Sequence, residues 1–151
     1  MDRSVTEFAT CESVELDHDQ GSDASEPRQD YFVERDGQVF AGLHLIVDLY
    51  DAAHLDNAEH IEQALVRAAE AAGATVLSSD FHVFSPNQGV SGVVILAESH
   101  ISIHTWPERN FAAVDVFMCG ACDPKDTISV LESAFTPSNM GITELRRGLP
   151  G

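Results

Sequence analysis

The sequence predicts an α+β fold, a two-layer α/β sandwich with a mainly antiparallel sheet and its helices on one face. Four strand-like segments follow one another between residues 75 and 120, and strands that are consecutive in sequence favour antiparallel pairing. Only two segments have helical periodicity, which is enough to cover one face of such a sheet. A chain of 151 residues, 44% of them hydrophobic, is long enough to form one core.

The globular domain is predicted to span 36–151 and to begin with one strand and one helix. The apolar run LHLIVDLY (43–50) is typical of a strand. Asp56 or Asn57 can cap the helix that follows, and Gly73 can end it. One face of this helix is apolar and consists of Ile61, Leu65, Ala68 and Ala72.

Most of the sheet is predicted in the second half of the domain. The turn SPNQG (85–89) separates the first two of four further strands, at 75–84, 90–97, 99–105 and 112–120. Asp123 and Pro124 form an N-cap with proline at the first helical position. Apolar residues at helical spacing follow, namely Ile128, Leu131 and Phe135. ITELRR (142–147) is the last strand, and the sheet face without helices is expected to be polar or to bind a partner.

Residues 1–35 differ in composition from the rest of the chain. They are polar, acidic and poor in large aliphatic residues, and they include the linker-like run GSDASEP (21–27). Such a segment buries too little apolar surface to offset the entropy lost on ordering. We therefore expect an acidic disordered tail, and a role for it in binding a partner stays open.

The formal net charge of −17 restricts the partners of this protein. It argues against nucleic acid and anionic membranes, both of which require clustered Lys and Arg, and it favours a cationic small molecule. No apolar run is long enough to cross a bilayer, and the N-terminus lacks the features of a signal peptide. The three cysteines, an odd number at uneven spacing, do not indicate a disulfide framework. We expect a cytoplasmic protein.

Several short motifs invite functional interpretations that the residues support poorly. Cys119 and Cys122 form a C-x-x-C pair, but a second pair that would complete a zinc site is missing. His100 and His104 share one face of a strand, yet roughly 13 Å separates them, which is too far to hold one metal ion. Ser91 lacks the second glycine of a hydrolase nucleophile elbow. No metal site is predicted.

One long stretch carries a family resemblance. GVSGVVILAESHISIHTWPE (89–108), followed by AAVDVFMCG (112–120), closely resembles the prokaryotic S-adenosylmethionine decarboxylases, and the resemblance extends more loosely over 40–148. These pyruvoyl-dependent enzymes are made as proenzymes that cut themselves at a Glu-Ser bond. The resemblance implies cleavage between Glu98 and Ser99, which gives a β chain of 1–98 and an α chain of 99–151. Ser99 would become the pyruvoyl group that forms a Schiff base with the substrate, without PLP or a metal.

The same resemblance implies roles for other residues. Ser91 and His104 would assist the cleavage, Ser91 by hydrogen bonding and His104 by proton transfer, for which an imidazole is suited because its pKa lies near working pH. Cys119 would donate a proton to the substrate carbon after CO₂ leaves. His100 and Cys122 have no role in this pattern.

Two residues match the substrate-binding positions of the family. Glu108 corresponds to the residue that binds the ribose hydroxyls, and Phe84 to an aromatic residue that stacks on adenine; a plain core role is the alternative for Phe84. The turn SPNQGVS (85–91) is one residue longer than its commonest form, which affects the alignment of Phe84. Tyr50 stands where relatives often have tryptophan.

The implied function is the conversion of S-adenosylmethionine to decarboxylated S-adenosylmethionine and CO₂ for spermidine biosynthesis. A homodimer of cleaved protomers, with active sites at the interface, is also implied. Two alternatives stay open at this point. One is a pyruvoyl-dependent ornithine or arginine decarboxylase of the same family, and the other is an uncleaved regulatory or binding paralogue.

Overall fold

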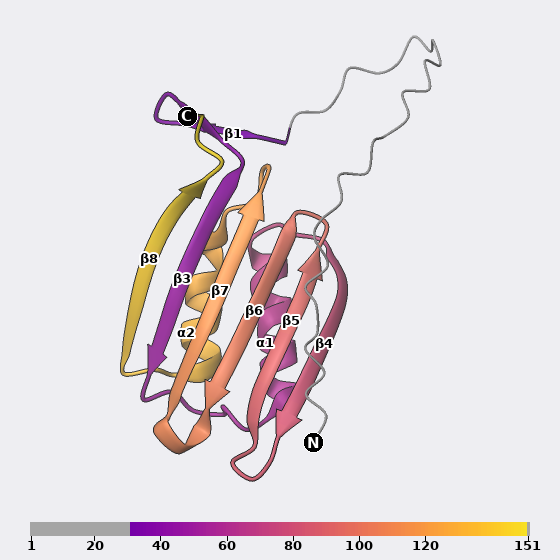
Figure 1. Ribbon diagram of the computed structural model, residues 1–151, viewed down its shortest axis with the longest axis vertical. Coiled ribbons are helices and arrows are strands. Elements are labelled where there is room, and N and C mark those ends of the chain that lie inside the picture. The colour runs from indigo at the N-terminus through magenta and orange to yellow at the C-terminus, as the bar shows by residue number, and fades with distance from the viewer. Residues whose placement is uncertain (1–30, 151) are drawn as a thin grey trace, which may run out of the picture.

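The computed structural model describes residues 31–150, which form a six-stranded sheet with two helices on one face (Figure 1). The strand order is β4-β5-β6-β7-β3-β8, and all neighbouring strands are antiparallel. This confirms the predicted fold class. The strands are β3 (Gly42–Tyr50), β4 (Val76–Phe84), β5 (Gly89–Leu96), β6 (Ser99–Trp106), β7 (Phe111–Cys119) and β8 (Asn139–Arg147). The helices are α1 (Ala58–Ala71) and α2 (Ile128–Phe135), with short 3₁₀ turns at Pro107–Arg109 and Pro124–Thr127.

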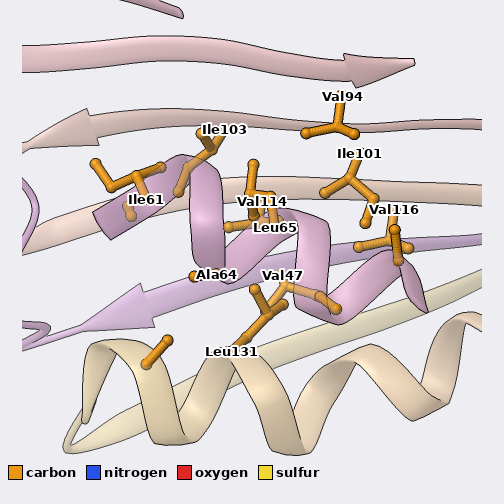
Figure 2. Packing of buried hydrophobic residues seen from close by; sticks show 14 of the residues in the cluster. Val47, Ile61, Ala64, Leu65, Val94, Ile101, Ile103, Val114, Val116 and Leu131 are labelled. Carbon is orange, nitrogen blue, oxygen red and sulfur yellow. The ribbon is translucent and has the colours of Figure 1, made fainter. Parts of the chain in front are cut away.

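The core lies between the sheet and the two helices. Alternate residues of the central strands point toward the helices, as period-two side-chain direction requires, and are fully buried. Figure 2 shows Ile61 and Leu65 of α1 among side chains of this layer. The labelled residues from the strands are Val47, Val94, Ile101, Ile103, Val114 and Val116.

Helix α1 begins where the sequence predicts a cap, whereas α2 begins later than predicted. The Asn57 side chain accepts a hydrogen bond from the His60 N–H at 3.1 Å, which satisfies a free donor at the start of α1. Gly73 follows the end of this helix with a positive φ of 81°. Asp123 accepts from the Lys125 N–H at 3.0 Å, but it caps a 3₁₀ turn, and the α-helix itself starts only at Ile128.

A hairpin that the sequence pattern does not predict lies ahead of the sheet. Strands β1 (Val33–Arg35) and β2 (Gln38–Phe40) pair antiparallel around Asp36 and Gly37, which both have positive φ. Asp-Gly is a strong hairpin signal, so the disordered tail expected over 1–35 is wrong at its C-terminal end. Residues 1–30 lie outside the described part of the chain.

The second face of the sheet, which we call the open face, is covered by neither helix (Figure 1). The open face carries polar and charged side chains, because in each strand it receives the residues that alternate with the core residues. Examples are His44 and Asp48 of β3, Ser102 and His104 of β6, and Asp115 of β7. It also carries exposed apolar residues, including Ile46, Tyr50 and Trp106. Between residues 31 and 150, no helix is long and apolar enough to cross a membrane.

Candidate active site

The predicted site residues form two groups at opposite ends of the sheet. Glu98, Ser99 and Cys119 lie at the end where β6 begins and β7 finishes. Ser91 and His104 lie opposite each other on β5 and β6, toward the other end. His104 is five residues along β6 from Ser99, a separation of roughly 16 Å at the usual rise per residue. Within one protomer the two groups do not meet.

The first group surrounds the peptide bond between Glu98 and Ser99, and we call it the cleavage-site group. The Glu98 carbonyl oxygen accepts two hydrogen bonds from one residue, since the Cys119 thiol donates at 2.8 Å and the Cys119 N–H at 3.2 Å. Ser99 has a positive φ of 157°, which is uncommon for a residue with a Cβ. Two donors on one carbonyl oxygen stabilise the negative charge that forms there when a nucleophile attacks the carbonyl carbon.

The Glu98 side chain is held as firmly as its carbonyl group. Its carboxylate accepts from the Thr75 N–H at 3.0 Å and from the Thr75 hydroxyl at 3.4 Å. Main-chain and side-chain contacts therefore fix this residue from two different elements, β7 and the segment before β4. These contacts orient the peptide bond that the sequence predicts to be cut.

A cavity of about 340 Å³ opens beside the cleavage-site group and is lined by Tyr31, Ala97, Glu98 and Cys119. Cys122 does not line it and is 6% exposed. Burial, followed by the charges of Glu98 and Cys119, raises the pKa of the Cys122 thiol. Both cysteines are free. Cys122 is thus a buried thiol, whereas Cys119 has access to a cavity.

The second group, which we call the relay group, centres on Ser91 and His104. The two residues are direct partners in the β5–β6 register, and Ser91 Oγ lies 2.8 Å from His104 Nδ1. A hydroxyl hydrogen-bonded to an imidazole can pass a proton to and from a third group placed at the ring. The pair is therefore equipped for proton transfer.

A second cavity, of about 300 Å³, joins the relay group to the predicted substrate-binding residues. Phe84, Ser91, His104 and Glu108 all line it, as do Trp106 and residues of the SPNQG turn. Phe84 is 51% exposed, so a plain core role for it is wrong. Trp106 is not among the predicted site residues, although its place two residues before Glu108 in the motif is a signal for it.

His100 directly follows Ser99, and its ring packs edge-on against Phe117, with 6.2 Å between centroids. Beyond Phe117, His44 Nε2 lies 3.1 Å from Asp115 Oδ1, and Arg147 contacts His44 Nδ1 at 3.2 Å. In the part of the chain that the structure describes, no three His, Cys, Asp or Glu side chains are grouped to hold a metal ion.

Comparison with known proteins agrees with the fold and the motif. A family model described as S-adenosylmethionine decarboxylase matches residues 43–148. The chain is 49% identical over 111 residues to the S-adenosylmethionine decarboxylase proenzyme of Acetivibrio thermocellus, covering 72% of this chain and 89% of that protein. It is 50% identical to the proenzyme of Caldicellulosiruptor saccharolyticus, with the same coverage.

A solved structure has the same arrangement of elements. The crystal structure of the adenosylmethionine decarboxylase from Aquifex aeolicus VF5 superposes with a TM-score of 0.67 and 37% sequence identity. The superposition covers 74% of this chain and 94% of that one. The relatives therefore share nearly their whole length with this protein, which has additional residues outside the common domain.

Proposed function

The chain belongs to the S-adenosylmethionine decarboxylase family and is an enzyme of that activity, and we propose that it generates its own pyruvoyl group by cutting the bond between Glu98 and Ser99. The observation that carries this proposal is the pair of hydrogen bonds from Cys119 to the Glu98 carbonyl oxygen. They prepare this one carbonyl group for nucleophilic attack.

The cleavage follows from the atoms at this bond. Ser99 Oγ attacks the Glu98 carbonyl carbon, and the C–N bond breaks as a C–O ester bond forms. Elimination then breaks the bond between Cβ and Oγ of Ser99, which frees the Glu98 carboxylate and leaves dehydroalanine. Water converts this residue to a pyruvoyl group and releases ammonia. The attack requires a base for the Ser99 hydroxyl proton, and a histidine relay suits that task.

We propose that the relay group acts on the cleavage site of a second copy of the chain. In its own protomer His104, with Ser91 beside it, lies roughly 16 Å from Ser99 along β6. This separation is too large for direct proton transfer. Two copies can pack with their open faces together, related by a two-fold axis that lies between the two sheets and perpendicular to the strands. Rotation about this axis reverses the strand direction, so opposite ends of the two sheets meet. His104 of one protomer then lies near Ser99 of its partner.

The open face supports this assembly. It has exposed apolar residues, including Ile46, Tyr50 and Trp106, that a partner would remove from water. A two-fold interface needs only one self-complementary patch. Each active site would then combine the cleavage-site group of one protomer with the cavity of Phe84 and Glu108 from the other.

Substrate binding follows from the same arrangement. The Glu108 carboxylate can accept hydrogen bonds from both ribose hydroxyls, and the exposed Phe84 ring offers a face to adenine. The charge of −17 attracts a substrate that carries a sulfonium cation. The pyruvoyl carbonyl supplies the electron sink for loss of CO₂, and the Cys119 thiol is placed to return a proton to the substrate carbon.

We propose that the product is the aminopropyl donor for spermidine synthesis. We also propose that the enzyme acts in the cytosol. The test of function measures CO₂ release from S-adenosylmethionine, ornithine and arginine labelled in the carboxyl group. We expect release from S-adenosylmethionine alone, and its loss in Glu108→Gln. Release from ornithine or arginine instead would overturn the substrate assignment. An uncut chain without release from any of them would indicate the regulatory paralogue.

A further inference from the structure

We propose that Tyr31 is a specificity-determining residue of this decarboxylase, which forms a wall of the substrate cavity and favours the sulfonium cation. The inference rests on the proposed function and deepens it. It concerns a part of the chain outside the family match, which begins at residue 43. Tyr31 therefore lies outside the residues that the family model matches.

The main chain of Tyr31 is attached next to the predicted proton donor. The Gly120 N–H donates to the Tyr31 carbonyl oxygen at 3.1 Å, and Gly120 directly follows Cys119. Gly120 has a φ of 66°, a conformation that glycine adopts at little cost. The chain turns away from β7 at this point, and Tyr31 occupies the space beside the turn.

The hairpin that follows Tyr31 is fixed to the sheet by Arg146 of β8. The Arg146 guanidinium donates to Asp36 at 2.7 Å and to Gln38 at 2.6 Å, and it lies over the Phe40 ring at 5.0 Å from its centroid. Several charge-assisted bonds from one planar group give a defined orientation. The hairpin therefore holds a fixed position from which it presents Tyr31.

The hairpin has a second attachment at Arg35, the last residue of β1. Arg35 lies 3.9 Å from the Asp123 carboxylate, on the segment that leads into α2. This half-exposed ion pair contributes little to stability by itself. Together with Arg146 and the Gly120 hydrogen bond, it ties the segment around Tyr31 to three separate elements.

The cavity that Tyr31 lines is the one beside the cleavage site. Its walls are Tyr31, Ala97, Glu98 and Cys119, and its volume is about 340 Å³. Tyr31 is 60% exposed, so its ring has surface available for a ligand. In this proposal a substrate held at residue 99 extends into the neighbouring cavity, and its sulfonium lies two methylene groups beyond its α-carbon. A cation close to an aromatic face is attracted by the ring quadrupole.

The test uses the full-length, self-cleaved enzyme with Tyr31→Ala and Tyr31→Phe, and Phe32→Ala as the control. Phe32 is the neighbouring exposed aromatic residue and does not line the cavity. In Tyr31→Ala we expect the KM for S-adenosylmethionine to rise about three- to thirty-fold, the range of a cation–π contact, with little change in kcat. Tyr31→Phe and Phe32→Ala should stay close to wild type.

A second ligand separates ring–cation attraction from general loss of shape. S-adenosylhomocysteine is a neutral thioether, and its inhibition constant should change much less in Tyr31→Ala than the KM of the sulfonium. Two results would overturn this inference alone when the wild type is active. One is an equal loss of affinity for both ligands in Tyr31→Ala, and the other is an unchanged KM for S-adenosylmethionine in that variant. An uncut, inactive wild type would overturn the proposed function together with it.

Discussion

The thiol of Cys119 donates a hydrogen bond to the carbonyl oxygen of Glu98 at 2.8 Å, across the end of the β6–β7 pair. The N–H of the same cysteine donates to the same oxygen at 3.2 Å. We propose that this one residue acts twice, first by stabilising charge at the bond to be cut and afterwards by donating a proton to the substrate carbon in the cavity that it lines.

Replacing Cys119 with alanine should slow self-cleavage and abolish decarboxylation. The Glu98 oxygen would keep the main-chain donor but lose the thiol, and loss of one such donor costs about 10²–10³-fold in rate. The cleavage rate is measured from the masses of the chains over time, and CO₂ release is measured on the chain that does cleave. Cys122→Ala is the matched control and should cleave at the wild-type rate.

A complementation experiment tests the composite active site. Ser99→Ala and His104→Gln should each remain uncut when produced alone. When they are produced together, a mixed dimer combines intact Ser99 of the His104→Gln chain with intact His104 of the other chain. We expect the His104→Gln chain, and only that chain, to be cut in mixed dimers.

The two chains are distinguished by mass, with an affinity tag on one of them to isolate the mixed dimer. His100→Gln, on the same strand but outside the relay group, should be cut when it is produced alone. If no His104→Gln chain is cut in the isolated mixed dimer, the composite site is wrong.

Cys122 gives a pH-dependent prediction. Burial, with Glu98 and Cys119 as smaller causes, raises the pKa of its thiol in the folded state. The folded state therefore binds this proton more tightly than the unfolded state. The resulting stabilisation is complete below the ordinary pKa of a thiol and is lost as pH rises toward the raised value.

Two measurements check this prediction. Denaturation at increasing alkaline pH should show a decline in stability that is smaller in Cys122→Ala. Iodoacetamide, which reacts with thiolates, should modify Cys119 in the native protein well before Cys122. Equal reactivity of the two thiols at pH 8 would contradict the burial argument.

Leu65 tests the account of the core. It is fully buried between α1 and the sheet (Figure 2), and Leu65→Ala should lower the free energy of unfolding by about 2–5 kcal/mol through lost transfer energy and the cavity left behind. Gln63→Ala, on the exposed face of the same helix, should change it by less than about 0.5 kcal/mol. Chemical denaturation of both variants, in the uncleavable Ser99→Ala background, gives the comparison.

The sequence predicts the sheet and the helices well because their signals are local. Alternation in β3, helical spacing in α1 and the cap at Asn57 are each decided within a few residues. Asp36-Gly37 is a good turn signal, but the polar composition before it indicates disorder, so the sequence does not predict the hairpin. Its stability comes from Arg146, more than a hundred residues away, which local composition does not reveal.

The residue types of the site were predictable, but their grouping was not. A continuous motif from Ser91 to Glu108 suggests one cluster, whereas the extended geometry of β6 carries its two ends apart. Cys119 reaches Glu98 only through the pairing of β6 with β7. Tyr31 is held beside Cys119 by a main-chain hydrogen bond from Gly120. A pattern of side chains in the sequence does not predict such a bond.

The most direct test of the central claim is the mass of the denatured, purified protein, with Ser99→Ala as the uncleavable control and Ser102→Ala as a matched serine on the same strand. For the wild type and for Ser102→Ala we predict two chains, 1–98 and 99–151. The second chain should begin with a pyruvoyl group in place of serine. Ser99→Ala should stay whole. A wild-type chain that remains uncut on incubation would contradict the self-cleavage on which the proposed mechanism depends.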